Sequence, residues 1–508
     1  MKRILYFVFW VIFCTSCGNF LEEYSQDLVY AQSCEDLDEI LIGNGYMAQP
    51  TTPSYFSYGD KAFYYPYLHV MDDDIEEYLT GNANISSSIN PVTTLRNFYI
   101  WAKEPFMRIS GLTFRDYDWK RMYEHIGYLN VIISYVKEFH EDSEEMRHRI
   151  LGEAQFLRAG YYFMLVNLYA NPYSKETADA TMGVPLNLTE YIEEGYFSRD
   201  PVAAVYRQIV TDLENAIVNL SGIKQPTIYR VNEKAARALL SRVYLYMQDW
   251  ENAKSTAEKL LAQNGALLDY SSIAENTDGY AISEKSPELL FSQGPLNLQC
   301  EFSGSGGDFC VSNDLYKLYD ENDYRQTIYF TRSTQSDSLG LNRKYQMGKH
   351  RSYVSDIFTL RTAEGYLNAA EACAMLGDAG AASGWLNRLR GKRIKDYEDV
   401  VYTAGEIIEQ VRVERRKELC LEGHRWLDLR RYAVCKKSPF KKIIERVYAL
   451  YDWDGRSVFK YAEVYQLNVD DPAYVFAIPK AVLEFDKDMP DNIREDREYV
   501  RLMYRNNE

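Results

Sequence analysis

The acidic triplet Asp72-Asp73-Asp74 is the part of this sequence that comes nearest to a catalytic or metal-binding motif. Adjacent carboxylates can bind a hard cation, and a pair of carboxylates can hydrolyse a glycosidic bond. Carboxylates that are neighbours in sequence cannot stand on opposite sides of one glycosidic bond, however, and the sequence does not specify the other ligands of a cation. The triplet therefore favours a polar loop whose carboxylates hydrogen-bond to a ligand or to the backbone.

The other residue types that could do chemistry lack the spacing that known sites need. No G-x-x-x-x-G-K-[ST] or H-E-x-x-H motif occurs, and the six histidines show no metal-ligand spacing. None of the eight cysteines makes a C-x-x-C pair, which disfavours structural zinc. Cys300 and Cys310 bracket a glycine-rich stretch and could be either a disulfide or two thiols. Asp452-Trp453-Asp454-Gly455 indicates a turn. We expect no catalytic residues, no metal and no cofactor.

The N-terminus has the pattern of a bacterial secretion signal. Lys2 and Arg3 precede an apolar run from Ile4 to Cys14, which is shorter than the roughly 20 residues of a membrane-spanning helix. Thr15-Ser16-Cys17 resembles a lipobox, in which cleavage before the cysteine leaves it lipidated at the mature N-terminus. An ordinary cleaved signal peptide is the alternative. We expect residues 1–16 to be removed and Cys17 to carry the lipid anchor.

The composition excludes several classes of protein. The chain has 508 residues, of which 46% are hydrophobic and 26% charged, as in a globular protein. Its net charge of −17 is the opposite of what a nucleic-acid partner requires, because binding phosphates needs positive charge. The 44 tyrosines stand out, since each offers an apolar ring with a polar tip. They suit either a ligand surface or packing between helices.

The spacing of apolar residues predicts two similar groups of helices. In the first, at 201–264, Asn232 is placed to cap one helix, and Gln248-Asp249 makes a tight turn before the next. In the second, at 362–433, Gly377 can take the left-handed conformation that ends a helix, and Asp378 can cap the next helix.

The two groups align when Asp249 is placed on Asp378. Ala253 then falls on Ala382, and Leu260 falls on Leu389. Small residues at these positions let antiparallel helices approach closely, as in tetratricopeptide-type repeats, whose units bury their faces by stacking. Any antiparallel helix pair would fit two such degenerate copies. We expect a mostly α fold, with a tetratricopeptide-like scaffold of helical hairpins.

The mature chain, 17–508, reads as a single domain. Helical pairs are expected at about 119–170, 201–264 and 362–433, and long irregular insertions at about 44–101, 268–360 and 450–500. Insertions of this length tend to carry function, so we expect them to carry the ligand surface.

The segment 414–431 is dense in charge and interleaved with apolar residues. Taken alone it could be a catalytic constellation or an anion site. The alternative is a helix, a break at Gly423 and a second helix, held by carboxylate–guanidinium pairs, because arginine binds carboxylates through two parallel hydrogen bonds. The bulky Trp426 and Leu429 favour burial, and hence the structural interpretation.

This segment, E-R-R-K-E-L-C-L-E-G-H-R-W-L-D-L-R-R, closely resembles the hallmark of the SusD/RagB family of Bacteroidetes surface lipoproteins. Further blocks agree with the family and follow in its order. They are E-A-Q-F-L-R-A-G-Y-Y-F-M-L-V-N-L-Y from Glu153, G-V-P-L from Gly183, S-R-D-P-V from Ser198, R-V-N from Arg230 and F-A-I-P from Phe476.

The resemblance implies a non-catalytic protein on the outer face of the outer membrane. Such proteins are lipid-anchored and cap a SusC-like TonB-dependent transporter, to which they deliver oligosaccharides or other nutrients, peptides included. Two other classes of function remain open: a lipid-anchored glycoside hydrolase that uses Asp73 with a distant carboxylate, and a purely structural scaffold of an outer-membrane complex.

Aromatic rings beside carboxylates and amides suit a glycan ligand, because sugars present flat apolar faces edged with hydroxyl groups. Two of the insertions supply such residues, although each ring could instead be packed in the core. The candidate ligand-binding residues are Tyr64, Tyr65, Tyr67, Asp72, Asp73, Tyr78, Asn82, Phe302 and Tyr345.

Overall fold

The computed structural model describes most of the chain. The described residues are 31–48, 64–77, 91–107, 116–191, 196–276, 278–294, 296, 298, 309–334, 338–346, 354–453 and 457–504. The expected signal peptide, the lipid site Cys17 and the candidates Tyr78, Asn82 and Phe302 lie outside these residues.

The protein is mostly helical, as expected, with 47% helix and a few small sheets. The longer helices are α4 (Tyr117–Tyr135), α5 (Glu144–Tyr169), α6 (Val202–Asn219), α7 (Glu233–Tyr246), α8 (Trp250–Gln263), α13 (Thr362–Leu376), α14 (Ala379–Arg390), α15 (Ile407–Leu419) and α16 (Arg425–Ala433). The shorter helices are α2 (Cys34–Ile40), α3 (Pro91–Tyr99), α9 (Tyr270–Glu275), α11 (Asn313–Tyr316), α12 (Tyr324–Tyr329) and α17 (Lys480–Phe485).

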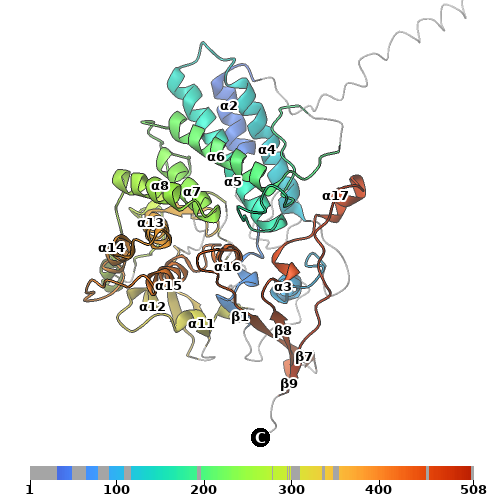
Figure 1. The fold of residues 1–508 in the computed structure, drawn as a ribbon, viewed down its shortest axis with the longest axis vertical. Coiled ribbons are helices and arrows are strands. Elements are labelled where there is room, and N and C mark those ends of the chain that lie inside the picture. Colours follow the sequence, from blue (N-terminus) through green and yellow to red (C-terminus); the bar gives the residue numbers. More distant parts are fainter. Residues whose placement is uncertain are drawn as a thin grey trace, which may run out of the picture.

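The long helices pack as a series in which successive helices are spatial neighbours. Helix α4 contacts α5, α5 contacts α6, and the series continues through α7 and α8. Helix α13 then packs on α8 although about a hundred residues separate them in sequence, and α14 and α15 pack on α13. Figure 1 shows α2, α4, α5 and α6 as one bundle, with α7, α8 and α13 to α16 continuing from it. This stacking confirms the expected tetratricopeptide-like scaffold.

The caps of the two aligned hairpins have the same geometry. Asp249 has φ −88° and ψ 76°, Asp378 has φ −89° and ψ 76°, and each carboxylate accepts a hydrogen bond from the backbone N–H three residues later. Ala253 and Ala382 are both fully buried. Gly377 ends α13 at φ +92°, in the left-handed region that favours glycine. The alignment read from the sequence therefore identifies equivalent structural units.

Helix α5 is buried on nearly every side, which requires a close approach at Gly152. A Cβ atom at this position would lie 2.6 Å from Cγ of Leu220 and 3.1 Å from Cβ of Asn219, at the end of α6. Gly127, within α4, has open space instead, since no atom lies within 4 Å of a Cβ built there.

These two helical glycines give opposite predictions for substitution by alanine. We expect Gly152→Ala to lower the free energy of unfolding by about 1–3 kcal/mol, because it forces α5 and α6 apart. We expect Gly127→Ala to raise it by up to about 1 kcal/mol, because alanine has the higher helix propensity and meets no clash. Urea unfolding measures both. Equal effects of the two substitutions would contradict the close packing of α5 on α6.

Short antiparallel strands lie beside the helices. Strand β1 (Ile75–Glu77) pairs with β3 (Phe309–Val311), β2 (Leu289–Ser292) with β6 (Thr359–Arg361), and β4 (Phe330–Arg332) with β5 (Leu339–Leu341). Cys310 in β3 is a buried free thiol, and Cys300, the other half of the possible disulfide, lies outside the described residues.

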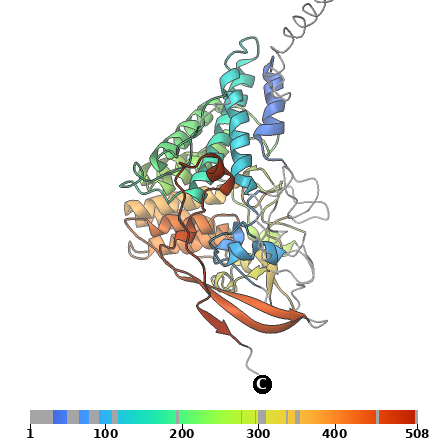
Figure 2. The same ribbon diagram turned by 90° about the vertical axis from the view of Figure 1, so that its right-hand side faces the viewer.

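A long hairpin occupies part of the segment expected to be irregular at 450–500. Strand β7 (Ile444–Trp453) pairs with β8 (Ser457–Leu467), and β9 (Arg501–Met503) pairs with β8 on its other side. Figure 2 shows the hairpin extending beyond the helices. The Asp454-Gly455 dipeptide lies between two runs rich in tyrosine and valine, which is a typical sequence signal for a β-hairpin. The predicted turn at Asp452–Gly455 agrees with this signal, but the prediction did not include the strands on either side. Among the described helices, none combines the length and apolarity needed to cross a bilayer.

Candidate functional site

The six described candidate residues are all buried. Their exposed fractions are 2% for Tyr64, 0% for Tyr65, 3% for Tyr67, 3% for Asp72, 6% for Asp73 and 1% for Tyr345. Tyr64, Tyr65, Tyr67, Asp72 and Tyr345 have almost no surface that a ligand could touch, so the structure corrects the prediction for these five residues and assigns them to the core. Asp73 is also buried, but it lines the groove described below.

The tyrosines among them pack against rings from distant parts of the chain. Tyr67 stacks on Phe98, with ring centroids 4.3 Å apart and planes 2° apart. The guanidinium of Arg121 lies over the ring of Tyr64, 3.8 Å from its centroid. The hydroxyl of Tyr345 donates to the carbonyl oxygen of Leu421 at 2.9 Å. Because tyrosine has both an apolar ring and a polar hydroxyl, residues that suit a sugar-binding surface also suit a protein core that contains polar groups.

Asp73 is the centre of a buried ion-pair cluster. Its carboxylate accepts from Arg425 at 2.6 and 3.0 Å and from Lys442 at 2.6 Å, and Arg416 lies at 3.3 Å. Burial raises the pKa of Asp73, but these three cations outweigh it and hold the pKa well below its usual value. A carboxylate that stays ionised cannot donate a proton to a leaving group, which argues against Asp73 as a general acid.

Asp72 and Asp74 complete the triplet with different surroundings. Burial and the charges of Asp74 and Asp73 raise the pKa of Asp72 well above its usual value. Asp74 accepts from Nε of Arg416 at 2.8 Å. The described residues contain no group of three or more His, Cys, Asp or Glu side chains that could hold a metal ion. The triplet is therefore a structural link between 72–74 and the segment 416–442.

The charged segment 414–431 has the arrangement expected from its structural interpretation. Helix α15 ends at Leu419, Gly423 takes φ +75°, and α16 begins at Arg425. Within the two helices, Arg415 pairs with Asp428 at 3.1 Å. Arg431 in α16 donates to Glu371 of α13, at 2.5 and 2.8 Å. These pairs confirm that the segment holds helices together.

Glu418 in α15 has three arginine partners, and all three come from outside this segment. It accepts from Arg325 at 2.8 Å, from Arg361 at 2.6 Å and from Arg393 at 2.9 Å. Burial raises the pKa of Glu418, but the three guanidinium groups outweigh it and hold the pKa well below its usual value. Isolated arginines carry no local pattern, so nothing in the sequence identified these partners.

Strands β1 and β3 bring the two predicted ligand-binding insertions together. Glu77, the last residue of β1, is paired with Phe309, the first residue of β3. Tyr78 and Asn82 follow β1 in the sequence, and Phe302 precedes β3. The segments that contain these three candidates therefore leave the described structure at one point, although more than 200 residues separate them.

An open groove of about 670 Å³ lies beside this strand pair. Its walls come from the candidate residue Asp73, β1, Tyr99 of α3, α11, the start of β7 and the end of β8. The polar side chains at the groove include Glu76, which accepts from Asn313 at 2.9 Å, and Asp314, which lies 3.3 Å from Lys442. Such a groove can hydrogen-bond to a ligand rich in hydroxyl groups.

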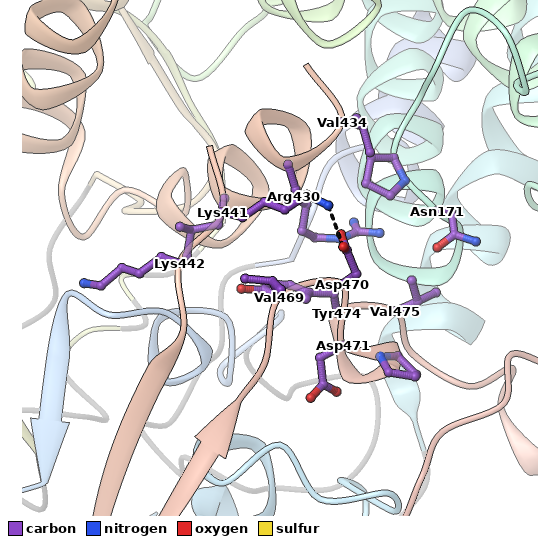
Figure 3. A pocket seen from close by; sticks show the side chains of 14 residues that line it. Asn171, Arg430, Val434, Lys441, Lys442, Val469, Asp470, Asp471, Tyr474 and Val475 are labelled. Carbon is purple, nitrogen blue, oxygen red and sulfur yellow. Dashed lines mark hydrogen bonds and ion pairs between the residues drawn. The ribbon is translucent and has the colours of Figure 1, made fainter. Parts of the chain in front are cut away.

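A second cavity, of about 170 Å³, lies on the other side of Lys442, which lines both. Figure 3 shows it between α16, the turn after α5 and the loop 469–475, with Arg430 at its centre. From sequence alone, Arg430 has no role beyond the ion-pair interpretation of its segment.

Two family models match the sequence. One, SusD-like and described as starch-binding and associating with the outer membrane, matches residues 72–245. The other, described as the SusD family, matches residues 332–493 and includes the charged segment. The chain belongs to the SusD family.

Known SusD-family proteins agree with this assignment. The SusD-like protein P25 of Formosa agariphila is 25% identical over 270 residues, which cover 52% of this chain and 46% of that relative. The chain thus matches about half the length of this curated relative.

Solved structures of the family share the fold. A SusD superfamily protein from Bacteroides thetaiotaomicron gives a TM-score of 0.68 at 21% identity, and the match covers 91% of this chain and 100% of that one. A protein from Bacteroides vulgatus described as sugar-binding gives 0.67 at 24% identity, covering 91% and 98%. Surface glycan-binding protein A from Bacteroides uniformis gives 0.64 at 19%, covering 91% and 100%.

Proposed function

We propose that this SusD-family chain is a non-catalytic lipoprotein of the cell surface that captures an oligosaccharide and passes it to a SusC-like TonB-dependent transporter. SusD-family glycan-binding proteins are non-catalytic. Support for a glycan ligand comes from the starch-binding description of the matching family model and from the surface glycan-binding protein of Bacteroides uniformis that shares the fold.

The observation that carries the proposal is the pairing of β1 with β3. It brings the ends of two aromatic-containing insertions to one place, beside a polar groove of about 670 Å³. Tyr78 and Phe302 would stack on sugar rings, while Asn82 and groove residues such as Asp314 would hydrogen-bond to hydroxyl groups.

A panel of oligosaccharides tested against the purified protein by calorimetry examines this proposal. We expect Tyr78→Ala or Phe302→Ala to weaken binding about tenfold or more, because aromatic anchors dominate such interfaces. Asn82→Ala and Asp314→Ala should have smaller effects. Tyr191→Ala is the matched control, since this tyrosine is 69% exposed and lies outside the groove.

The same panel separates the rival functions. Turnover of a glycan that disappears in Asp73→Asn would favour a hydrolase. Capture of the transporter with no glycan bound would favour a structural scaffold. Binding that is unchanged in all four groove and insertion variants would contradict the proposed site.

The anchor is part of the proposal and has its own test. We propose that residues 1–16 are removed and that Cys17 carries the lipid on the outer face of the outer membrane. Cys17→Ala should release the protein from membranes in cell fractionation, because no lipid can then be attached. If the variant stays attached and accessible to protease from outside the cell, lipidation at Cys17 is wrong.

A further inference from the structure

The groove beside β1 and β3 has more carboxylates than cations among the residues that line it. The acidic residues are Asp73, Glu76, Glu77, Asp314 and Glu445, against one lysine and one arginine. A ligand in the groove meets only the charges that it can reach and that the protein does not already compensate. The surroundings of each charge therefore decide which kind of ligand the groove prefers.

Both basic residues of the groove already have partners in the protein. Arg446 is 3% exposed, and its Nη1 donates to the carbonyl oxygen of Ile75. The Nζ atom of Lys442 lies between two carboxylates, 2.6 Å from Asp73 and 3.3 Å from Asp314. An anionic ligand would have to compete with these partners for either positive charge.

Two of the carboxylates are exposed at the rim of the groove. The side chain of Asp314 is 67% exposed, and that of Glu445 is 45% exposed. Glu445 pairs with Arg501 at 3.0 Å. Asp314 has only a share of Lys442, whose ammonium lies closer to Asp73. The charge of Asp314 is therefore the less completely compensated of the two.

Glu76 lies in the same part of the groove and forms no ion pair with a lysine or arginine of the described residues. Its partly buried carboxylate accepts from the side-chain amide of Asn313 at 2.9 Å, and Asp314 is the next residue in the chain. Burial raises the pKa of Glu76 despite this hydrogen bond and the charge of Arg446, and the charge of Asp314 acts in the same direction as burial. A positive charge brought by a ligand would stabilise both carboxylates.

We propose that the groove selects oligosaccharides that carry a free amino group, with the ammonium of one sugar unit bound at Glu76 and Asp314. This proposal rests on the proposed function of the groove as the glycan site, and it names the class of glycan. An ammonium presents three donors, and its hydrogen bonds to carboxylates are charge-assisted. An acidic sugar would instead meet the like charges of Asp314 and Glu445.

An ammonium suits these carboxylates better than a metal ion does. A hard divalent cation such as Ca²⁺ takes about six to eight oxygen ligands. The part of the chain that the structure describes has no group of three or more His, Cys, Asp or Glu side chains that could hold a metal. An ammonium needs fewer partners, and sugar hydroxyl groups can use the remaining polar groups of the groove.

Calorimetry with three tetrasaccharides that share one β-1,4-linked backbone tests the preference for charge. The tetramers consist of glucosamine, glucose and glucuronic acid, and are compared at one low ionic strength and at a pH at which the amine is protonated. We expect the glucosamine tetramer to bind about tenfold or more tighter than the glucose tetramer, and the glucuronic acid tetramer to bind most weakly. The proposal is overturned if the glucosamine tetramer does not bind, or binds no tighter than the other two.

Asp314→Asn tests the exposed carboxylate, because it removes the charge and keeps a side chain that can hydrogen-bond. We expect it to weaken binding of the glucosamine tetramer about tenfold and to leave binding of the glucose tetramer nearly unchanged. Asp179→Asn is the matched control. Asp179 is exposed, lies outside the groove and is 3.3 Å from Arg207, the same distance as Asp314 from Lys442.

Glu76→Gln provides a second variant and should weaken binding of the glucosamine tetramer by a similar factor. If both variants bind this tetramer like the unmodified protein, the assignment of the ammonium to Glu76 and Asp314 is wrong. An ammonium could also belong to a basic peptide, for which trilysine is the probe. Tighter binding of trilysine than of the glucosamine tetramer would overturn the assignment to a sugar.

A failure of this inference is distinguishable from a failure of the proposed function. If the glucose tetramer or another neutral glycan binds, and Tyr78→Ala weakens that binding, the proposed glycan site stands. Only the preference for an amino group is then rejected when the glucosamine tetramer binds no tighter. If no glycan of any charge binds, both proposals are rejected.

Discussion

Replacing Glu418 by glutamine is expected to lower the free energy of unfolding by about 3–5 kcal/mol. The carboxylate is fully buried and accepts hydrogen bonds from Arg325, Arg361 and Arg393, which are themselves 0–2% exposed. A glutamine keeps the size of the side chain but removes its charge. Three buried guanidinium groups then lose their shared counter-ion, and the low-dielectric surroundings make that loss large.

Unfolding in guanidinium chloride or urea, followed by circular dichroism, measures the effect of Glu418→Gln. Glu445→Gln is the matched control, because its pair with Arg501 is 45–53% exposed and such pairs contribute about 0–1 kcal/mol. If the two substitutions have similar effects, the buried cluster does not hold α15 to the rest of the protein in the way that its geometry indicates.

Acidification from pH 5 to pH 2 is expected to lower the free energy of unfolding by several kcal/mol. Protonation of Glu414 is expected to account for a measurable share of this loss. Burial raises the pKa of Glu414, but Arg325 and Arg390 outweigh it and lower the pKa from 4.5 to about 2. A carboxylate whose pKa is lower in the folded state than in the unfolded state stabilises the folded protein at pH values above its pKa in the unfolded state. That contribution, about 3 kcal/mol, is lost as the pH falls from about 4.5 to 2.

The other buried carboxylates decide whether acidification raises or lowers the free energy of unfolding overall. Glu418 and Asp73 act in the same direction as Glu414, because their pKa values are held well below normal. Asp72 acts in the opposite direction, because burial and the charges of Asp74 and Asp73 raise its pKa. Glu371, Glu422 and Asp428 also have lowered pKa values, whereas Glu76, Asp116 and Asp118 have raised ones like Asp72. Because the buried carboxylates with lowered pKa values outnumber those with raised values, we expect a net loss of stability on acidification.

Urea unfolding at several pH values between 2 and 7 tests this expectation. Glu414→Gln should be less stable at pH 7 and should lose less stability on acidification, since it has no proton to take up at this position. Glu445→Gln, at an exposed position, should keep the pH profile of the unmodified protein. A flat profile between pH 4.5 and 2 would show that the buried carboxylates are not ion-paired in solution.

The helical scaffold was predictable from sequence because its signals are local. Asn232 and Asp378 cap helices where predicted, Asp249 caps the helix that follows the predicted tight turn, and Gly377 and Gly423 take positive φ where the chain breaks. The sequence analysis predicts an irregular insertion where the structure has the β7–β8 hairpin, with strands of ten and eleven residues. Their turn signal was visible, but their pairing required joining two segments on either side of it.

The candidate site was less predictable than the scaffold. Composition predicts a ligand surface at Tyr64, Tyr65 and Tyr67, yet these residues lie in the core. Composition reports that a ring is amphipathic and not which neighbours surround it. The convergence of the segments that contain Tyr78 and Phe302 became visible only through the register of β1 with β3.

The sequence by itself determined the family, the helical repeats and the ion-pairing character of 414–431, because caps, apolar periodicity and alternating charge act within a few residues. The tertiary structure alone decided which side chains are buried and which charges are compensated. Asp73 pairs with Arg425 across 352 residues, and among the described residues Arg430 has no carboxylate partner whereas its neighbour Arg431 has two. Burial and charge pairing depend on partners that folding brings together from distant segments, and no local pattern encodes them.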